Sequence, residues 1–353
     1  MGAAGGASRL IDVLIVSLGS TQGLRTADRE LRDSLAKAGA SVALTAALAP
    51  RQKRTLMLTD LAWARAARAA ALSALAEQPS PPAAIVYSST TAALLWPRPG
   101  AIRFDATSAG NRPGRHGLWQ SPLERRRLGE APLLLPWSEG ALAESPAVAG
   151  LGDRALVVPV GVEPSGPLQL ARDIAAITYA ANPAKKGLDR VLAAWRGVRG
   201  ELPAGGAREL VVAGASAHEL RRAGLDPESV QDVRAVGALS AAEYRALVRR
   251  ARVFVCAPRR EDYGIAQLEA LADGCMLVTT PAPGPYAALP IACALDPRLV
   301  SEDLEGALRA ALHAPAPDYA ARAASALAPF RREAVDRLVA DELLPRLLSH
   351  TLG

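Results

Sequence analysis

The 353-residue sequence has few cysteines, and none of them is spaced as C-x-x-C. A zinc site or a redox-active disulfide is therefore not indicated. Cys256, Cys275 and Cys293 all lie in apolar runs. We expect all three to be buried free thiols.

Long hydrophobic runs are also absent. No stretch approaches 18 uninterrupted apolar residues, so no transmembrane helix is expected. The first ten residues lack a signal-peptide pattern, and the apolar run that starts at Leu10 contains Asp12. We therefore expect a cytoplasmic protein.

Lysine, histidine and aromatic residues are scarce. Aromatic residues make up 4% of the chain, and the four histidines are scattered. Neither a Ser–His–Asp set nor a D-x-D metal motif is present, so serine hydrolysis and metal binding are not indicated. The pI near 9.5 alone points to nucleic acid, but no aromatic platform or known motif supports that function. Only four of the 41 basic residues are lysines: Lys37, Lys53, Lys185 and Lys186.

Positive charge is concentrated in the first half of the chain. Residues 1–165 hold 18 basic and 13 acidic residues, whereas residues 166–353 hold 23 and 22. We expect the first half to attract an anion or an anionic membrane surface. A helix predicted over residues 51–77, with Arg65 and Arg68, could lie peripherally on such a membrane. The alternative is a solvated helix face.

Apolar runs of strand type alternate with segments of helical period, which is typical of an α/β fold. The length predicts two domains, each able to bury a core. We place them at residues 1–165 and 166–330, followed by a terminal helix in residues 331–353. The predicted strands are 10–18, 41–47, 84–87, 101–104 and 133–136, then 174–180, 209–213, 233–236, 253–257 and 276–280.

Two loops of the first domain are candidates for ligand contacts. A glycine-containing loop with Gly19 and Gly23 follows the first strand, where the backbone can approach an anion. The second loop, residues 107–120, follows Asp105 and includes His116. A polar loop of this length within a compact domain is usually functional.

The most informative stretch is residues 252–281, which predicts strand, charged loop, helix and strand. Glu261 lies in the loop, and Glu269 follows eight residues later, in the second helical turn. Two carboxylates near one loop suit contacts to hydroxyl groups. The helix start at Tyr263, Gly264 and Ile265 offers backbone N–H groups to a phosphate.

This stretch, P-x-x-E-D-Y-G-I-A-Q-L-E-A-L-A-D-G-C, resembles the E-x7-E signature of family 4 retaining glycosyltransferases with the GT-B fold. The resemblance implies two Rossmann-like domains that face each other across a cleft. It also implies that a last helix, here residues 333–348 with a kink at Pro345, crosses back to the first domain. The segment Gly161-Val162-Glu163-Pro164 resembles the family's turn between domains.

The resemblance assigns roles to residues of the second domain. It implies that Glu269 accepts hydrogen bonds from ribose hydroxyls and Glu261 from hydroxyls of the donor sugar. Lys186, with Lys185 beside it, would bind the donor phosphates. Asn182 stands where the family usually has an arginine, so either Lys185 would substitute for that residue or Asn182 itself would bond a phosphate oxygen.

Other implied roles are less regular. The backbone around Gly237 would face the nucleobase. Gly19 and Gly23 would face the acceptor and the donor phosphate. Asp105 stands where the family often has a histidine that touches the transferred sugar, and His116 lies eleven residues later. This departure puts the sugar contact in doubt.

The predicted function is therefore transfer of a sugar from a nucleotide-diphosphate donor to an acceptor hydroxyl. Retention at the anomeric carbon is implied, with no metal or other cofactor, because Lys186 and a helix dipole would carry the leaving-group charge. The acceptor, a glycan, a lipid or a small molecule, is not identified. Alternatives are a GT-B epimerase or hydrolase and a degenerate, non-catalytic protein that binds sugar nucleotides.

Overall fold

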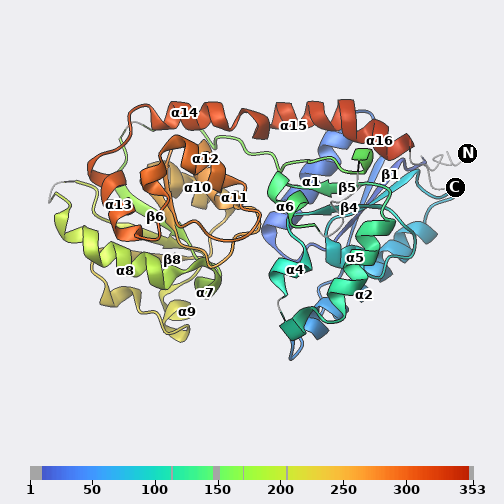
Figure 1. The fold of residues 1–353 in the computed structure, drawn as a ribbon, viewed down its shortest axis with the longest axis horizontal. Coiled ribbons are helices and arrows are strands. Elements are labelled where there is room, and N and C mark those ends of the chain that lie inside the picture. Colours follow the sequence, from blue (N-terminus) through green and yellow to red (C-terminus); the bar gives the residue numbers. More distant parts are fainter. Residues whose placement is uncertain (1–9, 113, 146–151, 170, 204–205, 350–353) are drawn as a thin grey trace, which may run out of the picture. The chain divides into compact units, whose positions relative to one another are not determined.

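The computed structural model describes residues 10–112, 114–145, 152–169, 171–203 and 206–349, except for the side chains of Arg115 and His116 (Figure 1). The chain divides into two compact units. Unit 1 is Met1–Gly161 with Arg332–Gly353, and unit 2 is Val162–Arg331. The chain thus passes from unit 1 to unit 2 after Gly161 and returns to unit 1 after Arg331. The boundaries expected from the sequence were near residues 165 and 330.

Unit 1 contains a parallel five-stranded sheet in the order β2-β1-β3-β4-β5. Its strands are β1 (Val13–Ser17), β2 (Val42–Ala46), β3 (Ala84–Tyr87), β4 (Ala101–Phe104) and β5 (Leu134–Pro136). Its first helices are α1 (Gln22–Lys37), α2 (Leu56–Ala76), α3 (Thr90–Ala93), α4 (Ser108–Asn111), α5 (Gln120–Glu130) and α6 (Glu139–Ala143). All five predicted strands are confirmed.

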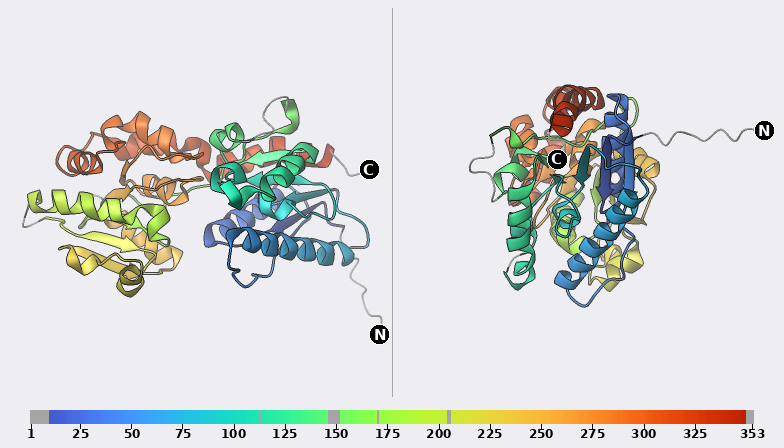
Figure 2. Two further views of the ribbon diagram at one scale, coloured as in Figure 1. Left: turned by 60° about the horizontal axis from the view of Figure 1, so that its bottom comes forward. Right: turned by 90° about the vertical axis from the view of Figure 1, so that its right-hand side faces the viewer.

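Successive side chains of β1 point to opposite faces of the sheet, so each face has its own core. Leu14 and Val16 pack with residues of α2, α3 and α5. Val13 and Ile15 pack with α1 and with the end of the chain. Figure 2 shows the blue strands of this unit with α2 along one side.

Unit 2 contains a second parallel sheet in the order β10-β9-β6-β7-β8. Its strands are β6 (Ile174–Tyr179), β7 (Leu210–Ala213), β8 (Val233–Gly237), β9 (Ala251–Cys256) and β10 (Met276–Thr279). Its helices are α7 (Pro183–Lys186), α8 (Leu188–Val198), α9 (Ala217–Arg222), α10 (Ala241–Arg250), α11 (Ile265–Ala272), α12 (Ala288–Leu295), α13 (Leu304–His313) and α14 (Tyr319–Ala326). Both sheets are parallel and doubly wound, as the alternating pattern predicts.

The chain then returns to unit 1. α15 (Arg332–Leu338), a π-helical turn (Val339–Leu343) and α16 (Leu344–Ser349) bury Val335, Val339, Leu343 and Leu347 against the sheet. Asp336 accepts hydrogen bonds from Ser34 (2.6 Å) and Lys37 (2.8 Å) of α1. The right-hand view of Figure 2 shows these red helices beside α1. The π-helical turn lies just before Pro345, which cannot donate an N–H to the preceding turn.

Predictions for one helix start, one loop and one cysteine are wrong. The helix expected from residue 51 begins at Leu56, because Thr55 caps it by accepting from the N–H of Leu58 at 3.2 Å. The expected loop 107–120 contains α4 and a 3₁₀ turn, Gly114–Gly117. Cys293 is exposed, whereas Cys256 and Cys275 are buried.

Within the described residues, no helix has the length and apolarity needed to cross a bilayer.

Candidate functional site

The central strand β6 of unit 2 lies between β9 and β7, so the strand order reverses between β6 and β9. In open parallel sheets, ligands bind beyond the carboxyl ends of the strands at such a switch point. The segments that follow β6 and β9 are therefore the expected place for a ligand. They contact each other, because the N–H of Arg259 donates to the carbonyl of Lys185 at 3.0 Å.

Gly187 lets these two segments approach closely. Its φ is +63°, and a Cβ atom there would overlap the backbone carbonyl of Ala257, just after β9. Only glycine satisfies both the left-handed backbone and this contact. Gly187 ends α7 and precedes α8, so it fixes the position of Lys186 against the loop that carries Glu261.

Lys186 and Glu261 form the central pair of the site. The ammonium of Lys186 donates to Glu261 Oε2 at 2.6 Å, and Gln267 Nε2 donates to the same oxygen at 3.0 Å. Glu261 is buried, and Lys186 is partly exposed. The amide oxygen of Gln267 is also buried and has no hydrogen-bond partner in the described part of the chain. A partly accessible cation, a carboxylate and an unused acceptor thus lie together.

A second ionic group lies next to this pair. Lys185 contacts Asp262 at 2.9 Å, and Arg260 contacts the other oxygen of Asp262 at 3.0 Å. Asn182 has a local role that sequence reasoning missed, since its side-chain oxygen caps α7 by accepting from the N–H of Lys185 at 3.0 Å. Asp262, Arg260 and Gln267 were not predicted as site residues. Only their position beside the E-x7-E residues could have indicated them.

The N-terminus of α11 faces this edge of the sheet. Gly264, with φ +90°, precedes it, and no side chain caps it among the described residues. A Cβ atom at Gly264 would lie 2.8 Å from the ring of Tyr286. Tyr263 is buried, and its carbonyl accepts from the N–H of Ala287 at 3.0 Å. Tyr263 therefore holds the loop, while the backbone from Ile265 opens the helix.

Glu269 lies one helical turn further along α11, and its side chain is 27% exposed. Arg245 of α10 contacts it at 3.3 Å. Tyr179, at the end of β6, and Tyr244 pack edge to face at 5.4 Å. Burial is the main cause that raises the pKa of both tyrosines above the usual range, and the charge of Glu269 is the second. Both hydroxyl groups therefore stay neutral. Gly237 ends β8 with φ +73°, and a Cβ atom there would lie in ordinary van der Waals contact with Ser216, at 3.8 Å.

Unit 1 holds the remaining predicted residues. Gly19, with φ +59°, follows β1, and its carbonyl accepts from Arg25 at 2.7 Å. The prediction of Gly23 as a loop residue is wrong, because Thr21 caps α1 and Gly23 lies in its first turn. Asp105 follows β4 and accepts from the N–H of Ala106 at 2.9 Å. The side chain of His116 lies outside the described part of the chain.

A buried ionic cluster near the end of β1 was missed altogether. Asp28 of α1 accepts hydrogen bonds from Ser17 and Ser88 and contacts Arg103 at 3.5 Å. Burial raises the pKa of Asp28, although Arg103 and the two serines oppose that shift. Arg103 also lies 4.8 Å from the ring of Trp137. The cluster ties α1 to β3 and β4 and so supports the loop at Gly19.

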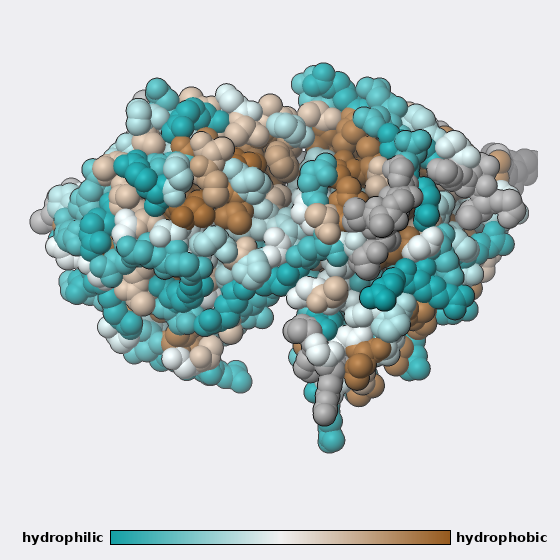
Figure 3. All heavy atoms as spheres, in the orientation of Figure 1, coloured by the Kyte–Doolittle hydropathy of each residue, from teal (hydrophilic) through white to brown (hydrophobic). Residues whose placement is uncertain are grey.

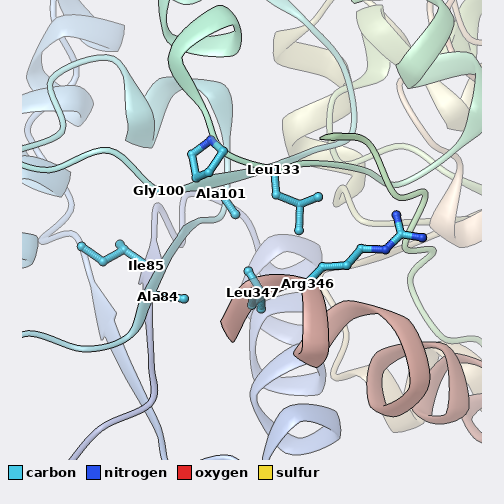
Figure 4. Close-up of a pocket in the computed structure, with 8 residues that line it drawn as sticks. Ala84, Ile85, Gly100, Ala101, Leu133, Arg346 and Leu347 are labelled. Atoms are coloured by element: carbon cyan, nitrogen blue, oxygen red, sulfur yellow. The ribbon is translucent and has the colours of Figure 1, made fainter. Parts of the chain in front are cut away.

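Figure 4 shows a shallow pocket of unit 1 that is not a candidate site. It lies at the starts of β3 and β4, against Arg346 and Leu347 of α16. This is the edge opposite to the carboxyl ends of the strands, where ligands of parallel sheets bind. Within the described residues, no group of three or more His, Cys, Asp or Glu side chains could hold a metal ion.

Comparisons with known proteins bear on the family and the fold. Residues 172–313, which include all of the unit 2 site, match the family described as Glycosyl transferases group 1. No curated protein matches the sequence. Many solved structures are similar in fold, and three of them match along nearly the whole chain.

The glycosyltransferase WaaG, involved in lipopolysaccharide biosynthesis, is 16% identical, with a TM-score of 0.63 over 96% of this chain and 97% of that one. Sucrose-phosphate synthase from Thermosynechococcus elongatus is also 16% identical, with a TM-score of 0.65 over 97% and 100%. HepE from Anabaena, in complex with UDP and glucose, is 13% identical, with a TM-score of 0.63 over 95% and 99%. The chain thus has the GT-B fold, and the family match of its second unit supports a glycosyltransferase enzyme.

Proposed function

We propose that the chain transfers a sugar from a nucleotide-diphosphate donor, held in unit 2, to an acceptor hydroxyl. The observation that carries this proposal is the group formed by Lys186, Glu261 and Gln267 at the switch point of the sheet. Lys186 can bind a phosphate oxygen, while Glu261 and the unused oxygen of Gln267 can accept from sugar hydroxyls.

The leaving diphosphate has two sources of positive charge in this arrangement. One is Lys186, with Lys185 beside it, and the other is the N-terminus of α11 after Gly264. These groups can stabilise the departing phosphate without a metal ion, so we propose a metal-independent reaction.

We also propose retention at the anomeric carbon, which the family resemblance implies. The carboxylates of Glu261 and Glu269 each contact a cation, at 2.6 Å and 3.3 Å. Such pairing lowers the nucleophilicity of a carboxylate and suits a role in binding hydroxyl groups. No covalent sugar–enzyme intermediate on either residue is therefore part of the proposal.

Glu269→Ala should weaken nucleotide binding while leaving the fold intact. A hydrogen bond to a charged group contributes about 1.5–3 kcal/mol, so the loss corresponds to roughly 10- to 100-fold in Kd. The measurement is calorimetric titration with UDP, GDP, ADP and dTDP. UDP comes first, because the HepE structure holds UDP and glucose.

The control is Glu243→Ala, because Glu243 caps α10 through Ser240 and lies outside the site. It should cost stability and leave nucleotide affinity unchanged. Equal affinities of the wild type and Glu269→Ala would remove Glu269 from the ribose site.

We further propose that unit 1 contacts an anionic membrane surface through residues 46–58, which form the loop before α2 and its first turn, rather than along the face of α2 that carries Arg65 and Arg68. Arg68 donates to the carbonyl of Leu95 at 2.9 Å, so it is engaged by the protein itself. Residues 46–58 instead expose Leu48, Leu56 and Leu58 by 87%, 50% and 46%. Arg51, Lys53 and Arg54 lie between them, with no acidic residue in the segment. Figure 3 shows brown, hydrophobic atoms among teal, hydrophilic ones on the face of the molecule that it draws.

The triple variant Arg51→Ala/Lys53→Ala/Arg54→Ala removes these three cations and should bind phosphatidylglycerol vesicles about 100-fold more weakly. Each cation near an anionic surface contributes about 1 kcal/mol to binding. Co-sedimentation measures this binding, and phosphatidylcholine vesicles give the uncharged reference. Leu168→Ser is the matched control, because Leu168 is a 55% exposed leucine of unit 2. Equal sedimentation of the triple variant and the wild type would contradict the membrane proposal.

A further inference from the structure

Arg245 of α10 joins three parts of unit 2 through one guanidinium group. Its Nε donates to Asp273 Oδ2 at 2.6 Å, and its Nη2 donates to the carbonyl of Glu163 at 2.8 Å. Its Nη1 contacts Glu269 Oε1 at 3.3 Å. The side chain is only 13% exposed. A planar guanidinium presents five N–H donors in a rigid fork, so it can hold three separate acceptors in a fixed geometry.

Asp273, which accepts from Arg245 Nε, anchors the segment through which the chain enters unit 2. Asp273 is fully buried at the end of α11. It accepts from the N–H of Ser165 at 2.7 Å and from the hydroxyl of Ser165 at 2.9 and 3.0 Å. The buried carboxylate and Arg245 therefore hold residues 163–165 to the helix that carries Glu269.

The segments through which the chain enters and leaves unit 2 contact each other beside this anchor. The N–H of Val162, the first residue of unit 2, donates to the carbonyl of Phe330 at 2.8 Å. The carboxylate of Glu163 lies 3.5 Å from Arg331, the last residue of unit 2. The side chain of Glu163 thus contacts Arg331, where the chain leaves unit 2, and the carbonyl of Glu163 contacts Arg245.

Of the three contacts of Arg245 described above, the one to Glu269 is the longest, at 3.3 Å. The side chain of Glu269 is 27% exposed, whereas that of Asp273 is fully buried. The charge of Glu269 also acts on Tyr244, whose hydroxyl is buried without a hydrogen-bond partner among the described residues. A ligand that donates to Glu269 would therefore compete with the contact between Glu269 and Arg245.

From this arrangement we infer that Arg245 is a positioning residue, which couples nucleotide occupancy at Glu269 to the anchoring of residues 162–165. The inference rests on the proposed function. Hydroxyls that donate to Glu269 take over part of its hydrogen bonding, and Arg245 then binds Asp273 and the Glu163 carbonyl more tightly. Coupling between two equilibria is reciprocal, so the state of the anchor must also change nucleotide affinity.

The amide of Ser165 reports on the anchor directly, because its hydrogen bond to Asp273 must open for exchange. Hydrogen exchange is measured on the full chain with and without saturating UDP, or the diphosphate of the panel that binds most tightly. We expect bound nucleotide to slow exchange at Ser165 about 5-fold or more in the wild type. In Arg245→Gln the nucleotide should bind about 10-fold more weakly, and at saturation it should leave Ser165 exchange unchanged.

Two further variants complete the test. Arg250→Gln, on the same helix, removes an exposed arginine that pairs with Asp173 and should behave as the wild type. Ser165→Ala keeps the backbone and removes only the hydroxyl, so it should fold even if Arg245→Gln does not. By reciprocity it should weaken nucleotide binding by about 5-fold, although Ser165 contacts no part of the proposed donor.

The outcomes separate the two proposals. Nucleotide binding with unchanged Ser165 exchange in the wild type, or with equal slowing in Arg245→Gln, would overturn the coupling and leave the proposed function intact. Unchanged affinity in Ser165→Ala would also overturn it. Failure of every nucleotide to bind the wild type would overturn the proposed function, and the coupling with it.

Discussion

Lys186→Met should lower the rate of nucleoside diphosphate release from the donor by about 100- to 1,000-fold, the usual effect of removing one group that stabilises transition-state charge. The ammonium of Lys186 is a partly exposed cation in the switch-point loops, placed by Gly187 and by its 2.6 Å contact with Glu261. The measurement is kcat and KM for the donor that the binding panel identifies. The loss should appear mainly in kcat, because the charge on the phosphate grows as the bond breaks.

A single substitution at Lys186 also leaves the buried carboxylate of Glu261 without its cation, which can cost about 3–5 kcal/mol of stability. The double variant Lys186→Met/Glu261→Gln removes both charges and should restore the melting temperature without restoring the rate. Lys185→Ala, whose ammonium is more exposed and contacts Asp262, should lose much less activity. A double variant with the same turnover as the wild type would exclude Lys186 from the reaction.

The wild-type enzyme should keep its turnover in the presence of a metal chelator. Loss of turnover in chelator, with recovery on addition of Mg²⁺, would contradict the metal-independent proposal.

Gly187→Ala should destabilise unit 2 by about 2–5 kcal/mol, because overpacking against an immovable group costs about 1–3 kcal/mol and a left-handed backbone costs about 1–2 kcal/mol. The new methyl group would overlap the carbonyl of Ala257, and that carbonyl belongs to the backbone. Relief of the overlap requires the segments after β6 and β9 to separate, so nucleotide binding should be lost as well. Denaturant unfolding and nucleotide titration measure the two effects.

Two glycines of the same unit separate the causes. Gly224 also has a positive φ, +79°, but nothing lies within 4 Å of the added Cβ, so Gly224→Ala should show the backbone cost alone. Gly200 also has open space, and its φ is not in the left-handed region, so Gly200→Ala should be nearly neutral. Equal stability of Gly187→Ala and Gly224→Ala would show that the close approach of the two segments does not matter.

Much of unit 2 could be predicted because its signals are local. The runs of β-branched and aliphatic residues gave the strands, which each depend on a few neighbouring residues. Glu261 and Lys186 were chosen from separate motifs. Their contact, however, depends on β6 lying beside β9, and strand order is a property of the whole sheet rather than of either motif.

The errors arose where a local capping residue or the tertiary context decides. Thr21 and Thr55 begin their helices, which places Gly23 inside α1 and the cations of residues 51–54 outside α2. The capping role of Asn182 was missed because it depends on the local backbone, in which the side-chain oxygen reaches the N–H of Lys185; its phosphate contact stays a prediction. Arg245 could not be predicted, because its importance depends on Asp273 and Glu163, which lie far from it in the sequence.

The most direct test of the central claim is turnover of nucleotide sugars by the wild type and by Lys186→Met/Glu261→Gln, with release of the free nucleoside diphosphate as the signal. The account predicts release from at least one donor by the wild type, and little or none from that donor by the double variant. Binding of nucleotides without release from any donor, with acceptors present, would contradict a transferase and indicate a protein that only binds sugar nucleotides.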